Sequence, residues 1–452
     1  MFAVFVATVL ISQICGTPTS SCLFGACIGT LIYQLITKGK SPIFISSCGA
    51  TCSAVIGALA IGNGNNYSAV IIGGIVICVI YTLFALIVKK IGIDIFNRIF
   101  PSYIVGAITI VIGLNLATFI PTYVSVNNEH SNVGILVAIF SMLVTALSSH
   151  YFKGFMKMIP FLIGLICGYI LSVIITLTTN IKLIDFSIFN NISLFAIPDF
   201  TFKYIKPISF TEVIQVVVIF TPVAICALLE HYSDHKVLSN IIGTDLTENP
   251  GLDKTLIGDG LASLIGTILC GLPNTSYGES IATIGFSKVA SRKVVTVAAL
   301  MLGVMSFIVP IQVFIQSIPS CVFGGLAMVL YGYIAASGLK TIINNKVDLN
   351  DNRSLIIVSV ILTVGVSGIY LFHQSFAGIS LAMVLGVILN VILKIRAIPM
   401  EKENVVTTNT DTYDFEYEKW KKDLSNYLKY SDSKFSNFEQ TTIPGYFEEE
   451  DK

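Results

Sequence analysis

Charged residues are scarce in this sequence, and their scarcity excludes most classes of protein. Only 12% of the 452 residues are Asp, Glu, Lys or Arg, while 54% are hydrophobic and the mean hydropathy is +0.81. A soluble protein of this length could not cover its surface with so few charges. The apolar residues form blocks long enough to cross a bilayer, which takes about 20 residues per helix. We therefore predict an all-α polytopic membrane protein, and expect neither an enzyme nor a nucleic-acid-binding protein.

The sequence also lacks the cysteine spacing of a metal or redox centre. Its ten cysteines are scattered through apolar segments without a C-x-x-C pair. This pattern favours small buried side chains, although Cys48 and Cys52 could share a helix face. We expect no metal ion and no cofactor. A basic segment and a small-residue cleavage site are also missing at the N-terminus, so the first apolar run is interpreted as a helix with a clipped start rather than a signal peptide.

Apolar runs between turn signals predict 14 membrane spans. If the N-terminus is cytoplasmic and each span crosses once, 17 Lys and Arg fall in inner loops, and only Lys182, Lys203 and Lys206 in outer loops. This bias follows the positive-inside rule and predicts both termini on the cytoplasmic side of the cell membrane. The spans cover about residues 2–15, 19–37, 42–62, 68–88, 99–120, 132–150, 158–178, 210–232, 254–272, 276–289, 294–316, 321–343, 354–372 and 376–395.

The longest outer loop, about residues 179–209, divides the chain into seven spans and seven spans. An odd number per half inserts the two halves with opposite orientation, as in inverted-repeat transporters. Spans 3 and 10 are counterparts, and both open with small and polar residues, at Ser41–Ala50 and Pro273–Ser280. Paired interruptions predict a binding site at the membrane midplane. The alternative is that these small residues only permit tight helix packing.

Three carboxylates lie in or near these segments. Glu279 follows Gly278 at the start of span 10, where a helix N-terminus would direct N–H groups at a ligand. Glu230 ends the apolar part of span 8, and Asp234 lies one turn later on the same face. The alternative for Glu230 is that it lies at a helix end in interfacial water. For Asp259 the sequence does not decide between a packing hydrogen bond and a functional role. Two carboxylates facing one cavity suit a neutral planar ligand with N–H and C=O edges, and could take up a proton.

Five motifs together resemble the nucleobase–ascorbate transporter family, most closely its uracil branch. The resemblance covers about residues 1–396 and implies 14 spans in two inverted repeats, about 1–178 and 210–396. It also implies a core domain of spans 1–4 and 8–11 and a gate domain of spans 5–7 and 12–14. Short extended strands would interrupt spans 3 and 10, with the nucleobase between them. The motifs are Glu230-His231, Asp245–Leu252, Pro273–Glu279, Leu330-Tyr331-Gly332 and Ala336–Leu339.

The resemblance also implies roles for single residues. Some uracil permeases carry a histidine, linked to proton coupling, where this chain has Asp234, and here His235 is the next residue. Proton coupling would therefore involve Asp234, His235 and Glu230. The sequence departs from the family signature at Ser280, Ala282, Ser287 and Lys288. These departures weaken the prediction of the substrate more than the assignment to the family. The residues that would bind the nucleobase are Glu230, Glu279, Gly278, Gly49, Tyr277 and Tyr331.

The implied function is proton-coupled import of uracil by alternating access, with a nucleobase, protons and the lipid bilayer as partners. A homodimer is left open. The alternatives are a xanthine or other purine permease, an anion exchanger or channel on the same fold, and a non-transporting scaffold or receptor. No Lys or Arg lies in spans 3, 8 or 10 before Lys288, which argues against an anion site.

Residues 397–452 fall outside the resemblance and form a polar tail. From Glu401 onward it carries 13 acidic and 7 basic residues. We predict that it is disordered, because it has too little apolar surface for a core of its own. A short helix is the alternative, with one face formed by Tyr417, Trp420, Leu424 and Leu428.

Overall fold

The computed structural model describes residues 1–47, 49–61, 66–92, 101–125, 132–179, 181–190, 192–367, 369, 377–395 and 422. Met1–Leu393 form one compact unit, and Lys394–Lys452 form a second. The predicted tail belongs to the second unit and, apart from Lys422, lies outside the described residues, as does Cys48. The fold is therefore described for the first unit.

The described chain consists of helices and two short strands. Their bounds are α1 (Phe2–Cys15), α2 (Thr19–Ile36), β1 (Ile45–Ser47), α3 (Gly49–Leu59), α4 (Tyr67–Ile91), α6 (Ser102–Ala117), α7 (Ile120–Val124), α8 (Asn132–Tyr151), α9 (Pro160–Thr178), α10 (Phe210–Ile242), α11 (Leu252–Ile268), β2 (Asn274–Ser276), α12 (Gly278–Ser287), α13 (Arg292–Met305), α14 (Val309–Ser317), α15 (Ser320–Asn344), α16 (Asn352–Val366) and α17 (Ala377–Ile395).

Seven of the described helices are long and apolar enough to cross a membrane by length and composition. Four shorter apolar helices accompany them: Val4–Cys15, Gly49–Leu59, Asn352–Val366 and Gly378–Leu393. The mainly helical architecture is confirmed, while the count of 14 spans stays a prediction. The seven long helices are Thr19–Ile36, Tyr67–Lys90, Ser102–Val124, Asn132–Tyr151, Pro160–Thr178, Phe210–Ile242 and Ser320–Asn344.

Two predicted spans differ from the helices observed. Predicted span 8 ends near residue 232, whereas α10 continues to Ile242, so the helix that carries Glu230 and Asp234 extends well beyond the apolar segment. Hydropathy falls at this point because the residues are polar, yet several of them are buried by partners on other elements. Predicted span 11 is divided into α13 and α14. Ile308 forms a β-bridge with Phe195, and a proline in the first turn of α14 favours a new helix start.

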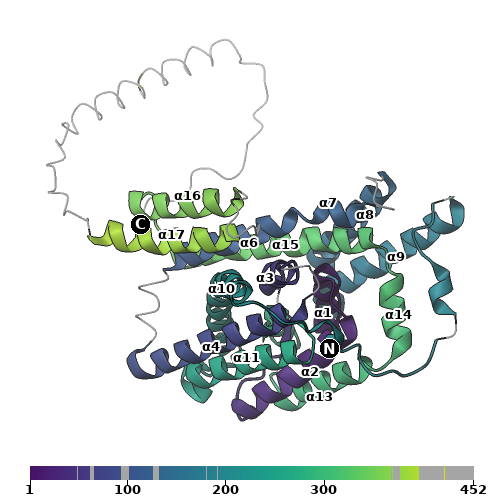
Figure 1. Ribbon diagram of the computed structural model, residues 1–452, viewed down its shortest axis with the longest axis horizontal. Helices are drawn as coiled ribbons and strands as arrows, with labels where there is room; N and C mark the ends of the chain where they lie inside the picture. Colours follow the sequence, from purple (N-terminus) through teal and green to yellow (C-terminus); the bar gives the residue numbers. More distant parts are fainter. Residues whose placement is uncertain are drawn as a thin grey trace. The chain divides into compact units, whose positions relative to one another are not determined.

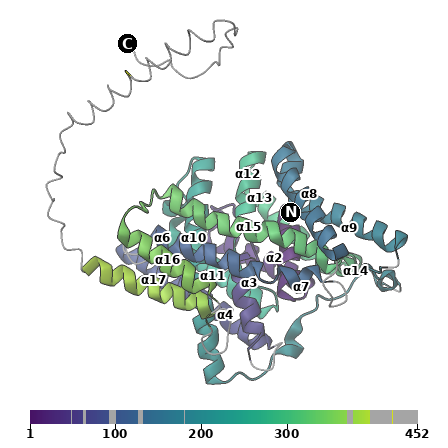
Figure 2. The ribbon, with the colours of Figure 1, turned by 90° about the horizontal axis from the view of Figure 1, so that it is seen from above.

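The helices of Met1–Leu393 pack in two groups, which are seen apart in Figure 1 and overlap in the view from above in Figure 2. In one group α11 packs against α2 and α4, α10 packs against α4, and α13 packs against α2. In the other group α15 packs against α6 and α8, α8 against α9, and α16 against α6. Helices α1 and α3 contact members of both groups. The two short strands thus lie among helices of the first group, since α2 contacts β1 and α11 contacts β2.

A close approach of α2 and α11 positions the second strand. A Cβ on Gly25 would lie 3.4 Å from Gly266 Cα, and a Cβ on Gly266 would lie only 2.4 Å from Asn274 Nδ2. Glycine at position 266 therefore leaves room for the Asn274 side chain, whose amide donates to the carbonyl oxygen of Gly25 at 3.0 Å. Asn274 is the first residue of β2, so this contact fixes where the strand begins.

Candidate functional site

A two-stranded antiparallel ribbon lies at the centre of the candidate site. Strands β1 and β2 pair with Ile45 opposite Ser276 and Ser46 opposite Thr275, and all six strand residues are buried. The Thr30 hydroxyl donates to the Ile45 carbonyl at 2.7 Å and accepts from its N–H at 3.1 Å. Buried extended backbone is stable only where such partners satisfy its polar groups. The strands lie at the two places where the sequence predicts interruptions.

A helix begins directly after each strand. Helix α3 begins at Gly49 and α12 at Gly278, and Tyr277, the residue before α12, offers no side-chain cap. The first N–H groups of a helix have no partner within it and favour acceptors or negative charge. A Cβ at Gly278 would lie 3.8 Å from Asp234 Oδ1, and one at Gly49 would lie 3.0 Å from Ile334 Cδ1. Two helix starts thus flank the ribbon, one beside α10 and the other beside α15.

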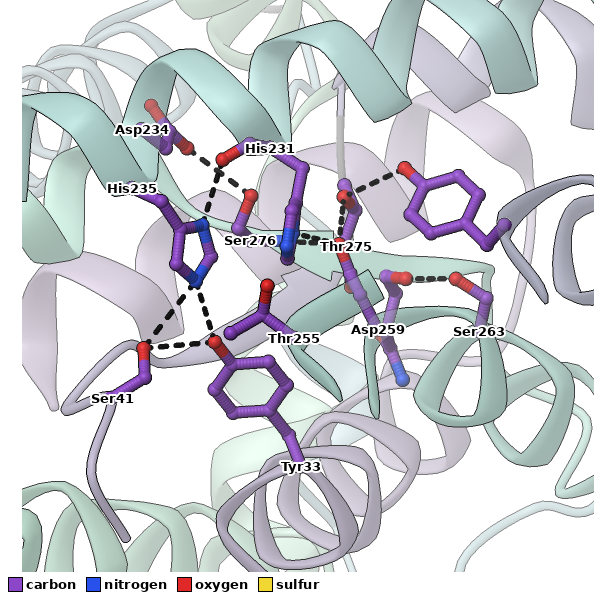
Figure 3. Close-up of polar contacts among 12 residues, drawn as sticks. Tyr33, Ser41, His231, Asp234, His235, Thr255, Asp259, Ser263, Thr275 and Ser276 are labelled. Carbon is purple, nitrogen blue, oxygen red and sulfur yellow. Dashed lines mark hydrogen bonds and ion pairs between the residues drawn. The ribbon is translucent and has the colours of Figure 1, made fainter. Parts of the chain in front are cut away.

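Asp259 and His231 form a fully buried pair beside the ribbon (Figure 3). Asp259 Oδ2 lies 2.6 Å from His231 Nδ1, and it also accepts from Thr275 Oγ1 at 2.9 Å and from the Ser276 N–H at 3.3 Å. Asp259 Oδ1 and His231 Nε2 have no hydrogen-bond partner within the described part of the chain. One carboxylate oxygen of α11 therefore connects α10 to β2. These hydrogen bonds also allow the carboxylate to remain in the interior, since a buried carboxylate needs such partners.

His235 continues this polar chain away from the ribbon (Figure 3). Its Nδ1 lies 2.7 Å from the carbonyl oxygen of His231, which can only accept, so Nδ1 carries a proton. In the neutral imidazole Nε2 is then an acceptor, and the Tyr33 hydroxyl lies 2.7 Å from it. The Tyr33 hydroxyl is also hydrogen-bonded to Ser41 Oγ at 2.8 Å. The rings of His231 and His235 have centroids 4.0 Å apart. Polar contacts therefore run from β2 through α10 to the segment before β1.

The predicted carboxylates of α10 lie on a neighbouring face of the helix. Glu230 and Asp234 are half-buried, whereas His231 and His235 are fully buried. Asp234 Oδ2 accepts a hydrogen bond from the Ser276 hydroxyl at 3.3 Å. The structure thus brings Asp234 to the ribbon, with Glu230 one helical turn earlier on the same face.

The remaining predicted site residues are placed differently. Glu279 belongs to the first turn of α12, and its side chain lies outside the described residues. The Tyr277 ring packs in a hydrophobic cluster with Leu23, Phe44 and others. Tyr331 is buried on α15, where its neighbour Leu330 and also Ile334 face Gly49.

From the sequence, Asp259 is undecided between a packing hydrogen bond and a functional role, and His231 has no assigned role. A signal for both was present, because α11 carries a polar residue at every fourth position and α10 repeats the same spacing with two histidines and Ser239. Residues four apart share a helix face, and a polar face within an apolar helix indicates buried polar partners. All of these side chains are buried: Thr255, Asp259, Ser263 and Thr267 on α11, and His231, His235 and Ser239 on α10.

The turn between α10 and α11 holds the two helices in register. Asp245 Oδ1 accepts from the Thr247 N–H at 2.8 Å and from its hydroxyl at 2.6 Å, and Oδ2 lies 3.0 Å from Lys236 Nζ. The Thr247 and Lys236 hydrogen bonds lower the pKa of Asp245 to about 2. Asp245 therefore stays ionised across the physiological range, and pH-dependent behaviour must come from other groups.

Comparison with known proteins gives a consistent result. Residues 1–374 match the sequence profile of the permease family. The uracil permease of Bacillus subtilis (strain 168) is 34% identical over 419 residues, covering 90% of this chain and 93% of that protein. The uracil permease of Escherichia coli (strain K12) is 33% identical over 413 residues, covering 90% and 92%. The solved transmembrane domain of the cyanobacterial bicarbonate transporter BicA matches with a TM-score of 0.57 and 15% identity, covering 86% of this chain and 94% of that one.

Proposed function

Because the chain belongs to this permease family, the nucleobase–ascorbate transporters, and is a multi-pass membrane protein, we propose that it imports uracil together with protons across the cell membrane. The observation that carries the proposal is the buried ribbon of β1 and β2, with helix starts at Gly49 and Gly278 and a carboxylate-bearing face of α10 beside it. Uracil is proposed as the substrate because the similar proteins of Bacillus subtilis and Escherichia coli are uracil permeases.

The chemistry of uracil fits this arrangement. Uracil is neutral and planar, and its edge alternates N–H donors with C=O acceptors. In the proposal, backbone N–H groups at Gly278 and Gly49 donate to its carbonyl oxygens, while the carboxylates of Glu230 and Glu279 accept its N–H groups. Tyr331 would cover the base from α15, and Tyr277 would border the pocket through the backbone that precedes α12.

Alternating access would move one group of helices against the other. The proposed core comprises predicted spans 1–4 and 8–11, which correspond to α1 to α4, the ribbon and α10 to α14. The proposed gate comprises spans 5–7 and 12–14, which correspond to α6 to α9 and α15 to α17. The packing of the helices in two groups supports this division into core and gate. In the proposal, the body covers residues 1–396 and has 14 spans. Both termini would lie in the cytoplasm, as the distribution of Lys and Arg predicts.

Uptake of labelled uracil into proteoliposomes tests the proposal. With a more acidic exterior, we expect uracil to accumulate inside and a protonophore to abolish the accumulation. Thymine, xanthine, hypoxanthine and ascorbate should compete less well than unlabelled uracil. Uptake that ignores the pH gradient would remove proton coupling from the proposal, and stronger competition by xanthine would make the chain a purine permease.

Asp234 is the proposed centre of proton coupling. Glu230 and Asp234 lie one turn apart on the same face of α10, so the two carboxylates can share one proton. His235 is the second candidate, but both of its ring nitrogens already contact Tyr33 and the α10 backbone.

Asp234→Asn should therefore separate coupling from binding. We expect equilibrium binding of uracil within about threefold of the parent, because the amide oxygen can still accept from Ser276, while gradient-driven accumulation falls at least about tenfold. Asp245→Asn is a matched control, since asparagine preserves the turn that Asp245 caps. If accumulation by Asp234→Asn matched the parent between about pH 5.5 and 8, the role would pass to His235 or Glu230.

A further inference from the structure

A cavity of about 570 Å³ lies apart from the ribbon. Its lining includes Gly16, just after α1, and Leu59, the last residue of α3. The ribbon lies at the opposite end of α3, which has 11 residues. At about 1.5 Å per residue, the cavity and the ribbon are separated by roughly 15 Å along this helix. The cavity is therefore distinct from the proposed uracil site.

The long loop between α9 and α10 forms one wall of the cavity. Ala196, Ile197, Asp199 and Tyr204 of this loop line it. The same loop carries the three lysines that charge distribution places outside, so the cavity belongs to the outer face.

This wall is held in place on two sides. The Ala196 N–H donates to the Phe307 carbonyl at 3.0 Å, at the junction of α13 and α14. The Asp199 N–H donates to the Ser20 hydroxyl at 3.0 Å, in the first turn of α2. The cavity is thus bounded by anchored backbone, and its polar side chains have defined positions.

The chemistry of the lining disfavours an anionic ligand. None of the lining residues is lysine or arginine, and Asp199 is their one acidic member, so an anion would find no counter-charge there. Three carboxamides line the cavity: Gln13, Gln312 and Gln316. The Gln13 amide donates to Thr19 Oγ1 at 2.9 Å, and within the described part of the chain this is its one side-chain hydrogen bond.

We propose that this cavity is a second binding site for a neutral pyrimidine base, reached from outside before the central site. The donor–acceptor pair of a carboxamide matches the adjacent N–H and C=O of such a base, and Leu59 and Phe307 supply apolar contact for its faces. The inference rests on the proposed function for the identity of the base. It goes beyond that function because it places a second molecule of the base outside the ribbon.

Site-directed labelling tests the second site separately from the first. Gln316 is exposed, so Gln316→Cys should react with a membrane-impermeant maleimide added outside proteoliposomes of known orientation, above the level of the parent protein. Uracil should slow this reaction, and the half-protecting concentration should stay the same when Glu230→Gln has weakened binding at the ribbon. Uracil uptake by Gln316→Cys shows that the labelled protein is folded and also reports on the proposed function.

Two further variants test whether the cavity lining binds the uracil that protects the cysteine. Gln312→Ala should raise the uracil concentration that gives half-protection by about fivefold, the loss expected for one neutral hydrogen bond. Gln215→Ala, a glutamine of α10 outside the cavity lining, should leave it unchanged. Failure of the maleimide to label from outside, absence of protection, or a higher half-protecting concentration in Glu230→Gln would each overturn the second site. Of these, none would contradict uracil transport itself, which is measured by uptake.

Discussion

Glu230→Gln is expected to lower the affinity for uracil at least about tenfold. Glutamate can accept N–H bonds with both terminal oxygens, whereas glutamine replaces one oxygen with a donor that would face the N–H of the base. Loss of a hydrogen bond to a charged group costs about 1.5–3 kcal/mol, which corresponds to tenfold or more in affinity. Equilibrium binding of labelled uracil to the purified protein measures the effect. Glu279→Gln is expected to have a similar effect, from its place in the sequence motif.

Glu212→Gln is the matched control on the same helix. The Ser209 N–H donates to Glu212 Oε2 at 2.7 Å in a capping box at the start of α10, and glutamine can accept the same bond. This variant should bind uracil like the parent. If Glu230→Gln and Glu279→Gln also bound like the parent, the uracil site would lie elsewhere.

Asp259→Ala is expected to destabilise the protein by about 3 kcal/mol and to abolish uracil uptake. The substitution removes the acceptor that His231 Nδ1, the Thr275 hydroxyl and the Ser276 N–H share. It also leaves His231 buried without its partner. Strand β2 would lose two of the contacts that hold Thr275 and Ser276. Thermal unfolding of the purified protein and uptake in proteoliposomes measure the two effects.

Two further variants test whether the acceptor at Asp259 is responsible for the effect. Asp259→Asn keeps an acceptor at the same place and should recover part of the stability. Asp253→Ala lies in the first turn of the same helix, is half-buried, and should change stability by less than about 1 kcal/mol. Equal effects of Asp253→Ala and Asp259→Ala would show that the buried pair has no special part in the fold.

The sequence was most informative where a pattern extends over many residues. Long apolar runs predicted most of the helices closely, and the spacing of Glu230 and Asp234 correctly placed both on one helix. The continuation of α10 to Ile242 could not be predicted from hydropathy, because a hydropathy profile counts His231 and His235 as hydrophilic. Their burial depends on Asp259 and Tyr33, which come from other helices. A sequence shows that such residues are polar, but it does not show which distant residue satisfies them.

From the residues alone, the ribbon could be predicted only as a pair of interruptions, and the strands themselves were implied by the family resemblance. Three residues are too few for a strand periodicity, so small residues around Gly49 and Gly278 were the available signal. Their pairing depends on the packing of α2 against α11, where Gly25 approaches Gly266. Nor does the sequence show that Tyr277 packs into a hydrophobic cluster.

The pairing of β1 with β2 also sets an order of events during biosynthesis. Strand β1 leaves the ribosome long before β2, so the first half of the chain must enter the membrane with an unpaired extended segment. The Thr30 hydroxyl bonds both the N–H and the carbonyl of Ile45, and both residues belong to that first half. This contact can hold the nascent strand until Ser276 arrives opposite Ile45. Completion of the ribbon therefore needs the second half of the chain as far as β2, and a half-length product would lack the proposed binding site.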